Sequence, residues 1–260
     1  MSMHSASVGA PLLAPQRAAG GAVAVDFVAF PAAGAGASGF RGWRGRLPEG
    51  WRFTVVNLPG REGSFGAPFA TDMAALADGV AAELRAVRAT APDAPLVLFG
   101  HSMGGLLALL VAHRVSADGL VVAACAPPGA RRLELGAEPP GDDALRLDVA
   151  EALAAAGLSE LFAGAAEGVL DEMVDLAMPV LRADIELLTT FQAPAGPLGC
   201  RILALYGKDD PLAPASWSAE TTALADCSVL DGGHFFVQVS PDRVIAELQR
   251  WLASVPEGVR

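Results

Sequence analysis

A serine in a tight turn, a histidine and a pair of neighbouring aspartates could together attack and cleave a carbonyl compound. The serine is Ser102, in the pentapeptide Gly100-His-Ser-Met-Gly104. A G-x-S-x-G segment between a buried strand and a helix is typical of a nucleophile elbow, which lifts the serine hydroxyl clear of a sheet. Small residues two before and two after the serine are needed because larger side chains would collide within the turn. The pattern therefore predicts Ser102 as a nucleophile rather than as a loop serine between flexible glycines.

A serine hydroxyl is a poor nucleophile without a base, and the chain has four histidines. His234 lies in Asp231-Gly-Gly-His-Phe-Phe236, before the closing helix, and its glycines suit a loop that brings an imidazole to the serine. We predict His234 as the base. We interpret His101 as a packing or hydrogen-bonding residue that points away from the reacting face, and His113 as structural.

Two aspartates follow a buried strand in Leu203-Ala-Leu-Tyr-Gly-Lys-Asp-Asp-Pro211. A carboxylate is needed to fix the tautomer of the base, and this class of site has the chain order serine, acid, histidine. We predict Asp210 as the acid, because the G-x-x-D-P spacing clears the turn and Pro211 fixes the chain after it. Asp209 is the alternative.

Two backbone N–H groups must stabilise the oxyanion that forms during acyl transfer. One is expected at Met103, the first residue after the serine. The other is expected in the small-residue loop Ala32-Ala-Gly-Ala-Gly-Ala-Ser38, at Ala32 or Ala33, and we favour Ala33. Small residues suit this role because the backbone must approach the substrate closely.

Short apolar runs alternate with helical patterns around these residues. Continuous apolar strands of this kind indicate a parallel sheet covered on both faces. Their order, with a small-residue loop after the first strand and the elbow after a later one, predicts an α/β-hydrolase fold. The expected strands are 23–30, 53–58, 96–99, 119–125, 201–206 and 228–230. The expected main helices are 72–89, 105–113 and 241–252, and Asp72 is expected to cap the first of them.

The alternation stops between about residues 142 and 192, where only helical segments are expected, at 143–156, 167–177 and 181–191. We interpret this stretch as a helical lid inserted into a single domain that covers residues 23–260. Residues 1–22, rich in Ala, Gly, Ser and Pro, are predicted to form a disordered or loosely attached tail. As a hypothesis, the lid is the mobile part of the molecule.

Composition narrows the possible functions. The 260 residues carry a net charge of −11, which argues against nucleic-acid binding. Three cysteines without C-x-x-C spacing argue against a zinc site and a disulfide framework. The first 22 residues do not resemble a signal peptide and no apolar run is long enough to span a membrane, so we expect a cytoplasmic protein. No segment suggests an oligomer interface, and a monomer is expected.

The motifs resemble those of the type II thioesterases that work alongside polyketide synthases and non-ribosomal peptide synthetases. Leu58-Pro-Gly-Arg-Glu62 matches the family's L-P-G-R-E motif, and Met178-Pro-Val-Leu-Arg-Ala-Asp184 matches the P-x-L-R-A-D segment of its lid. The elbow, acid and base segments also match, and the resemblance runs from about residue 27 to residue 252. The first loop departs from the family's F-P-x-A-G-G pattern, with Ala32 in place of a frequent histidine and Ala35 in place of the second glycine.

The resemblance implies an editing thioesterase with Ser102 as nucleophile, Asp210 as acid and His234 as base. Such enzymes clear unreactive short acyl groups from the phosphopantetheine arm of acyl or peptidyl carrier domains, and they need no cofactor or metal of their own. Carrier domains are usually acidic, so docking would require a local basic patch. The candidates are Arg131 and Arg132 beside the lid and a second group near the first loop, comprising Arg41, Arg44 and Arg46. Arg61 and Arg182 are expected to form structural ion pairs.

Three other functions compete with this interpretation. A general carboxylesterase or acyltransferase could use the same fold, because fold alone does not determine chemistry. A type I thioesterase domain that releases finished products normally ends a large synthase, whereas this chain begins with a methionine and is expected to stand alone. A non-catalytic carrier-binding protein is expected to lose at least one of Ser102, Asp210 and His234, and all three are present.

Overall fold

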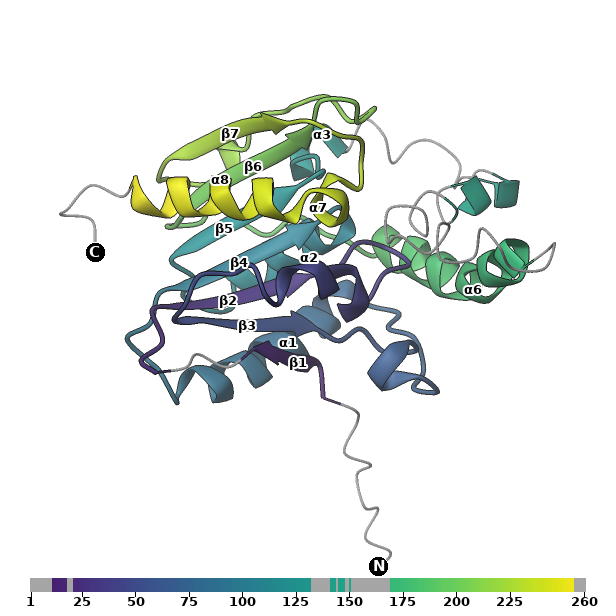
Figure 1. Cartoon of the computed structure of the whole chain (residues 1–260), viewed down its shortest axis with the longest axis horizontal. Helices are drawn as coiled ribbons and strands as arrows, with labels where there is room; N and C mark the ends of the chain where they lie inside the picture. Colours follow the sequence, from purple (N-terminus) through teal and green to yellow (C-terminus); the bar gives the residue numbers. More distant parts are fainter. Residues whose placement is uncertain are drawn as a thin grey trace, which may run out of the picture.

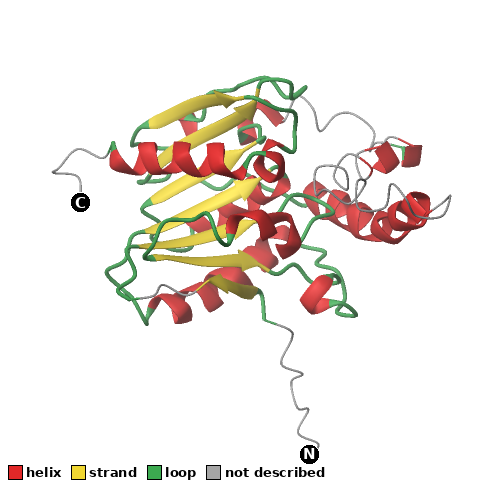
Figure 2. Cartoon of the chain, in the orientation of Figure 1, coloured by secondary structure: helices red, strands yellow, loops and turns green. Residues whose placement is uncertain are grey.

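A seven-stranded sheet forms the centre of the computed structural model, which describes residues 11–17, 21–131, 141–143, 145–147, 150 and 169–254 (Figures 1 and 2). The strand order is β1-β3-β2-β4-β5-β6-β7. All neighbouring pairs are parallel except β1 and β3. The strands are β1 (Leu13–Arg17), β2 (Val25–Phe30), β3 (Trp51–Val56), β4 (Leu96–His101), β5 (Gly119–Ala123), β6 (Arg201–Gly207) and β7 (Ala225–Leu230).

The central strands are buried on both faces, as their continuous apolar sequences predict. Every residue of β4 and β5 is buried, and so are five of the six residues of β2. Phe30 at the end of β2 pairs with Gly100 at the end of β4. The loop that follows β2 therefore begins beside the elbow that follows β4, where the strand order changes direction. Open α/β sheets place their ligand sites at this kind of position.

Helices cover the two faces of the sheet (Figure 1). On one face, α1 (Met73–Arg88) and α2 (Met103–Ala112) pack on the sheet through a core cluster that includes Val28, Phe30 and Leu98. Asp72 caps α1 by accepting a hydrogen bond from the Ala75 N–H, as the sequence predicts. On the other face lie the 3-10 segment η1 (Ala37–Trp43) and the helices α7 (Phe236–Val239) and α8 (Pro241–Ala253).

Strand β1 corrects part of the predicted N-terminal tail. Leu13–Arg17 pair antiparallel with β3, and the side chain of Leu13 is buried. The carboxylate of Glu83 accepts hydrogen bonds from the N–H groups of Leu12 and Leu13. The pairing is made mainly by backbone groups on an edge strand that contains Pro15, so the sequence carries little strand signal there. Residues 1–10 and 18–20 of the predicted tail lie outside the described residues.

Helix α6 (Val169–Thr189) replaces the two helices expected at 167–177 and 181–191 with a single helix that contains Pro179. The apolar residues Val174, Met178 and Leu181 follow one another at helical spacing across the proline and share a buried cluster with Leu145. Packing of this continuous stripe offsets the hydrogen bond that the proline removes. The helix expected at 143–156 falls largely outside the described residues.

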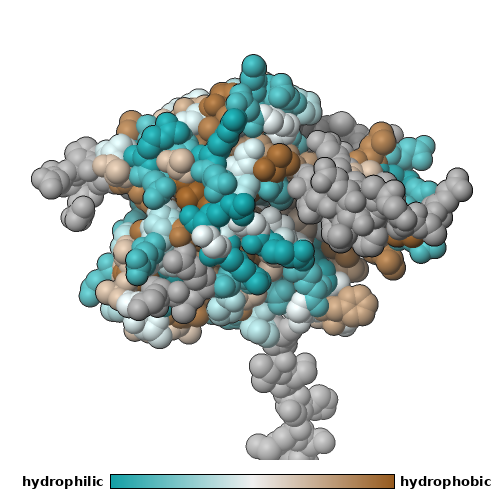
Figure 3. All heavy atoms as spheres, in the orientation of Figure 1, coloured by the Kyte–Doolittle hydropathy of each residue, from teal (hydrophilic) through white to brown (hydrophobic). Residues whose placement is uncertain are grey.

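Shorter segments connect these elements: η2 (Glu62–Ser64), α3 (Pro128–Arg131) and η3 (Ser218–Glu220). Within the part of the chain that the structure describes, no helix is both long and apolar enough to cross a lipid bilayer. On the face shown in Figure 3, hydrophobic residues occur in small groups scattered among hydrophilic ones.

Candidate active site

Ser102 occupies a strained turn between β4 and α2. Its backbone has φ +52° and ψ −119°, a conformation that non-glycine residues rarely adopt. The Ser102 N–H donates to the Ala123 carbonyl at 2.8 Å, which holds the turn against β5. A Cβ atom added to Gly100 would lie 2.2 Å from the Gly104 carbonyl oxygen. The turn can therefore close only with glycine at this position, as the elbow pattern predicts.

Gly104 brings the start of α2 against the end of β2. A Cβ atom at Gly104 would lie 2.2 Å from the Phe30 carbonyl oxygen and 2.6 Å from that of Pro31. The first N–H groups of a helix have no partner within the helix, and Met103 is the first residue of α2. The start of α2, where Met103 lies, is therefore packed against the beginning of the loop that follows β2.

The loop after β2, residues 31–36, contains a tight turn. The Ala35 N–H donates to the Ala32 carbonyl at 3.1 Å, and Gly34, the third residue of the turn, has φ +75°. A positive φ at this position is typical of a type II turn and favours glycine. Ala33, the predicted second oxyanion donor, is the residue that precedes Gly34.

Asp210 and His234 meet at the ends of β6 and β7. The His234 Nδ1 lies 3.0 Å from Asp210 Oδ2. The Asp210 side chain is fully buried, whereas that of His234 is 30% exposed. A Cβ atom at Gly207 would lie 2.5 Å from the Gly232 carbonyl oxygen, so glycine allows the two loops to approach each other. Asp209, the alternative acid, is exposed, and Asp210 is the aspartate that contacts His234.

The environment keeps the Asp210 carboxyl ionised. Burial alone raises the pKa of this group, but the hydrogen bonds from His234 and from the Leu212 N–H outweigh burial, and the net pKa is lowered. A buried carboxylate bonded to Nδ1 leaves the other ring nitrogen, Nε2, as the one available to a serine hydroxyl.

The sequence predicts a packing or hydrogen-bonding role for His101 but does not identify its partner. Its side chain is completely buried, and its Nε2 lies 2.8 Å from the His234 backbone carbonyl oxygen. Burial, with a smaller contribution from the nearby His234, lowers the pKa of His101 to about 3, so the ring is neutral near pH 7. Because a carbonyl only accepts, Nε2 carries the proton, and Nδ1 accepts from the Gln238 amide at 3.3 Å. His101 is thus a hydrogen-bonding residue, as expected, and its partner is the loop of the predicted base.

The arginines named in the sequence analysis fall into two sets: those expected to form structural ion pairs and those expected to dock a carrier domain. Arg61 forms a buried ion pair with Asp184, and Arg182 forms an exposed one with Asp142, so both expected ion pairs are present. Of the candidates for carrier docking, Arg131 is the last residue of α3 and Arg132 lies outside the described residues. In the second group, Arg41 is exposed, Arg44 bonds to Gln16, and Arg46 pairs with Asp242.

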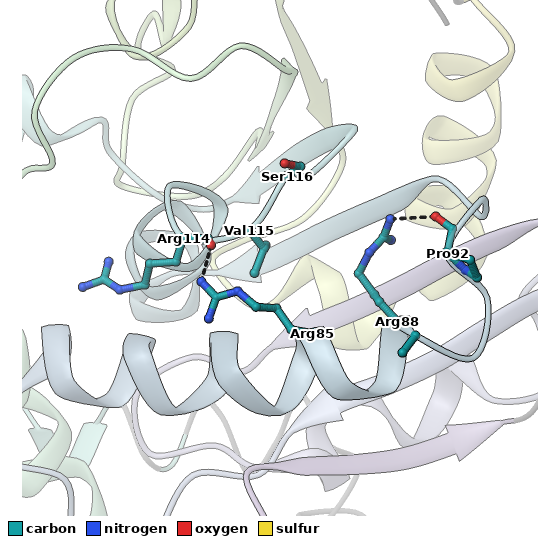
Figure 4. A pocket seen from close by; sticks show the side chains of 7 residues that line it. Arg85, Arg88, Pro92, Arg114, Val115 and Ser116 are labelled. Atoms are coloured by element: carbon teal, nitrogen blue, oxygen red, sulfur yellow. Dashed lines mark hydrogen bonds between the residues drawn. The ribbon is translucent and has the colours of Figure 1, made fainter.

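A cavity of about 400 Å³ lies far from these residues, where α1 and α2 end and β4 and β5 begin (Figure 4). It is lined by arginines that already donate to backbone carbonyls: Arg85 to that of Arg114, and Arg88 to those of Pro92 and Ala94. The acceptor carbonyls belong to the segments that follow the two helices, so these arginines are engaged with the backbone at the opposite edge of the sheet from Ser102. No cluster of three potential metal ligands occurs among the described residues.

Comparison with known proteins places this architecture in a family. Residues 26–252 match the model of the thioesterase domain. A probable cadicidin biosynthesis thioesterase from Streptomyces griseus is 31% identical over 241 residues, which cover 88% of this chain and 63% of that protein. This chain thus spans slightly less than two thirds of the length of that relative.

Solved structures of thioesterases share the fold. The RedJ thioesterase from the prodiginine biosynthetic pathway of Streptomyces coelicolor superimposes with a TM-score of 0.73 at 31% identity, over 88% of this chain and 86% of RedJ. The type II thioesterase BorB from the borrelidin biosynthetic cluster gives a TM-score of 0.72 at 29% identity, over 93% of this chain and 97% of BorB. The chain belongs to the thioesterase family and has its α/β-hydrolase fold.

Proposed function

We propose that this protein is a type II thioesterase that hydrolyses short acyl thioesters from the phosphopantetheine arm of carrier proteins. The observation that carries the proposal is the 3.0 Å contact between His234 Nδ1 and Asp210 Oδ2 at the sheet edge that also bears the strained Ser102. Membership of the thioesterase family supports thioesters as the substrate class. The pairing of a serine, a histidine and a buried carboxylate supports acyl transfer through a covalent intermediate.

In the first half of the proposed reaction, Ser102 Oγ attacks the thioester carbonyl carbon while His234 Nε2 takes the hydroxyl proton. The carbonyl π electrons move to oxygen, and the N–H groups of Met103 and Ala33 stabilise the resulting oxyanion. Collapse of this intermediate breaks the carbon–sulfur bond. His234 returns its proton to the leaving thiolate, so the phosphopantetheine arm departs as a thiol and an acyl-serine remains.

In the second half, water attacks the acyl-serine carbonyl and gives its proton to His234 Nε2. Collapse of the second oxyanion breaks the bond to Ser102 Oγ, which recovers the proton, and a carboxylic acid is released. Throughout, Asp210 holds the imidazole in one tautomer and stabilises its charged form. The proposed steps use side chains and backbone N–H groups of this protein, water and the substrate, and they require no cofactor.

Carrier-bound acyl groups fit the relatives' names, which refer to cadicidin, prodiginine and borrelidin biosynthesis. We propose that the partners are carrier domains of a polyketide synthase or a non-ribosomal peptide synthetase, and that Arg131 and Arg132 contribute to docking. A cytoplasmic location and a monomeric state remain our predictions.

Charge reversal at both Arg131 and Arg132 should slow turnover of carrier-bound thioesters and leave turnover of free thioesters unchanged. Equal rates on the carrier would contradict this docking site.

Helix α6 supports the proposed lid over residues 142–192, because its Leu181 packs against Gly34 in the loop after β2. A phosphopantetheine arm is long and thin, so a serine beneath a helical cover can be reached through a narrow opening. We propose that the lid moves as substrates enter. Hydrogen exchange should then be faster in 169–189 than in the core helix α2, and equal protection of the two helices would contradict a mobile lid.

Single-turnover release of short acyl groups from a phosphopantetheinylated carrier protein tests the function directly. Matched free thioesters and oxygen esters serve as comparison substrates, and Ser102→Ala is the control. Faster release from the carrier, abolished in the variant, is the expected result. Indifference to the carrier together with good oxygen-ester turnover would instead indicate a general esterase.

A further inference from the structure

The two family motifs that the proposed chemistry does not use, L-P-G-R-E and P-x-L-R-A-D, meet in the folded protein. Arg61 of the first and Asp184 of the second form a two-point ion pair across 123 residues of sequence, with Arg61 Nη2 lying 2.6 Å from Asp184 Oδ1. Their side chains are 7% and 3% exposed. Removing two charges from water costs free energy that their mutual attraction often only offsets, so a buried ion pair need not stabilise the fold. A gain in stability therefore does not by itself explain this pair.

Both members of this pair also bind the backbone of the loop after β2. Asp184 Oδ2 accepts a hydrogen bond from the Gly34 N–H at 2.8 Å. Arg61 Nη1 donates to the Ala35 carbonyl at 3.2 Å. Glu62, the next residue of the first motif, accepts from the Ser38 N–H at 3.2 Å in η1, directly after the loop. The turn that contains Ala33 is thus held from outside by side chains of two distant segments.

These contacts fix the conformation of the turn. The Gly34 hydrogen bond sets the plane of the Ala33–Gly34 peptide, and the Ala32–Ala35 hydrogen bond closes the turn around it. On the other side, Phe30 is held in β2 and against Gly104. Ala33 therefore lies between two fixed points, and the direction of its N–H is determined by them.

The contact also links the turn to the lid, because Asp184 belongs to α6. Figure 1 shows α6 beyond the ends of the strands, next to the loop that follows β2. A Cβ atom at Gly34 would lie 3.4 Å from Leu181 Cδ1, so the helix packs directly on the turn. If α6 moved away, the Gly34 N–H would lose its carboxylate acceptor and Arg61 would lose its partner.

We propose that Asp184, supported by Arg61, is a positioning residue for the oxyanion hole, and that the hole is complete only while α6 is docked on the loop. This inference rests on the proposed function, in which the Ala33 N–H stabilises the oxyanion. Asp184 acts through the Gly34 amide and touches neither the substrate nor the reacting atoms. Losing Asp184 should therefore raise the free energy of the transition state, in which negative charge develops on the carbonyl oxygen, more than that of the bound substrate.

The test compares Asp184→Ala with Arg182→Met, which breaks the exposed Arg182–Asp142 pair on the same helix. Loss of a complete oxyanion donor costs about 100- to 1000-fold in kcat, and a misdirected donor should cost roughly 10- to 100-fold. Asp184→Ala should therefore lower kcat by that factor with little change in KM for a carrier-bound thioester. Arg182→Met should leave both constants unchanged. A fall in thermal stability of Asp184→Ala with kcat intact would overturn the proposal.

A second pair of variants separates the Gly34 hydrogen bond from the cost of an unpaired buried charge. Arg61→Met with Asp184→Asn removes both charges and keeps an oxygen acceptor for the Gly34 N–H. Arg61→Met with Asp184→Leu removes both charges and the acceptor. The first double variant should retain at least ten times the kcat of the second, and equal kcat values would overturn the proposal.

Labelling with an alkyl fluorophosphonate gives a readout that does not require thioesterase activity. Ser102 Oγ bonds to phosphorus, fluoride leaves, the serine proton passes to His234, and the phosphoryl oxygen occupies the oxyanion hole. Labelling should slow in Asp184→Ala by about the same factor as kcat. If the wild-type protein is labelled but hydrolyses no thioester, the proposed function is refuted. Slower labelling of Asp184→Ala would even then support the role of Asp184 in positioning the oxyanion hole. Wild-type protein that shows neither reaction would refute both.

Discussion

The two halves of the candidate site are built by different forces. The half that holds Ser102 depends on close backbone packing, in which Gly100 and Gly104 leave no room for a Cβ atom. In the half that holds His234, glycine also allows a close backbone approach at Gly207, but the ring is oriented by hydrogen bonds: His234 Nδ1 donates to Asp210, and His101 donates to the His234 backbone carbonyl. Close backbone packing thus fixes the turn that holds Ser102, whereas hydrogen bonds made with side chains orient His234.

The largest expected effect is on the rate of thioester hydrolysis when Ser102, in the half built by close backbone packing, is replaced. Ser102→Ala should lower thioester hydrolysis by roughly 10⁴- to 10⁶-fold, because the attacking oxygen is removed. Its thermal stability should change little, since alanine at φ +52° retains the strain. Ser102→Gly should be equally inactive but more stable by about 1 kcal/mol, because glycine adopts this conformation freely. Steady-state kinetics and thermal melts of both variants measure the two effects, and a Ser102→Gly protein no more stable than Ser102→Ala would show that the turn is unstrained.

The corresponding change at the hydrogen-bonded half is Asp210→Asn. It should lower kcat by about 10³- to 10⁴-fold, because the amide no longer holds the imidazole in the reactive tautomer or stabilises its charge. Asp209→Asn is the matched control and should retain nearly full activity, since Asp209 is exposed. If the two variants lost activity equally, the contact between Asp210 and His234 would not be the one that matters for catalysis.

Packing at the elbow is tested by Gly104→Ala, whose Cβ would collide with the carbonyls of Phe30 and Pro31. Overpacking against backbone that cannot move should lower the free energy of unfolding by about 3 kcal/mol. Gly129→Ala, in the helix that follows β5, adds a methyl group with no atom within 4 Å and should not destabilise the protein. Urea denaturation of both variants gives the comparison, and similar stabilities would mean that the elbow tolerates a wider turn.

A smaller effect, when it is counted per pH unit, is the pH dependence of stability that the buried imidazole of His101 causes. Its pKa is about 3 in the folded protein and about 6.5 when unfolded, so between these values the unfolded chain binds the additional proton. The free energy of unfolding should therefore fall by up to about 1.4 kcal/mol for each pH unit below 6.5. The pKa of Asp210 is lowered from 3.8, so its contribution is lost only at lower pH.

His101→Gln should reduce this slope, because a glutamine amide can still donate to the His234 carbonyl and does not titrate. Urea denaturation between pH 4.5 and 7 measures the slope. His113 also has a lowered pKa, caused by burial and by Arg114, so His113→Gln is the comparison that separates the two histidines. An unchanged slope in His101→Gln would show that the pH dependence comes from elsewhere.

Much of this protein follows from local sequence. The apolar runs predict the parallel strands, Asp72 predicts the cap of α1, and the glycines around Ser102 predict the elbow, because each signal depends on residues a few positions apart. The choice of Asp210 over Asp209 also followed from local turn spacing, and in the structure Asp210 contacts His234.

Other features were decided only by tertiary structure. Strand β1 forms through backbone pairing with β3, and α6 continues through Pro179 because its apolar stripe is buried. The contact from His101 to the His234 carbonyl spans 133 residues, and the pair of Arg61 with Asp184 spans 123. Local periodicity cannot specify such partners, because whether two polar groups meet depends on how the whole sheet and its helices are packed. The sequence by itself therefore determined the tight turn at Ser102 and most of the order of strands and helices, and the folded chain alone determined which distant side chains contact the candidate site.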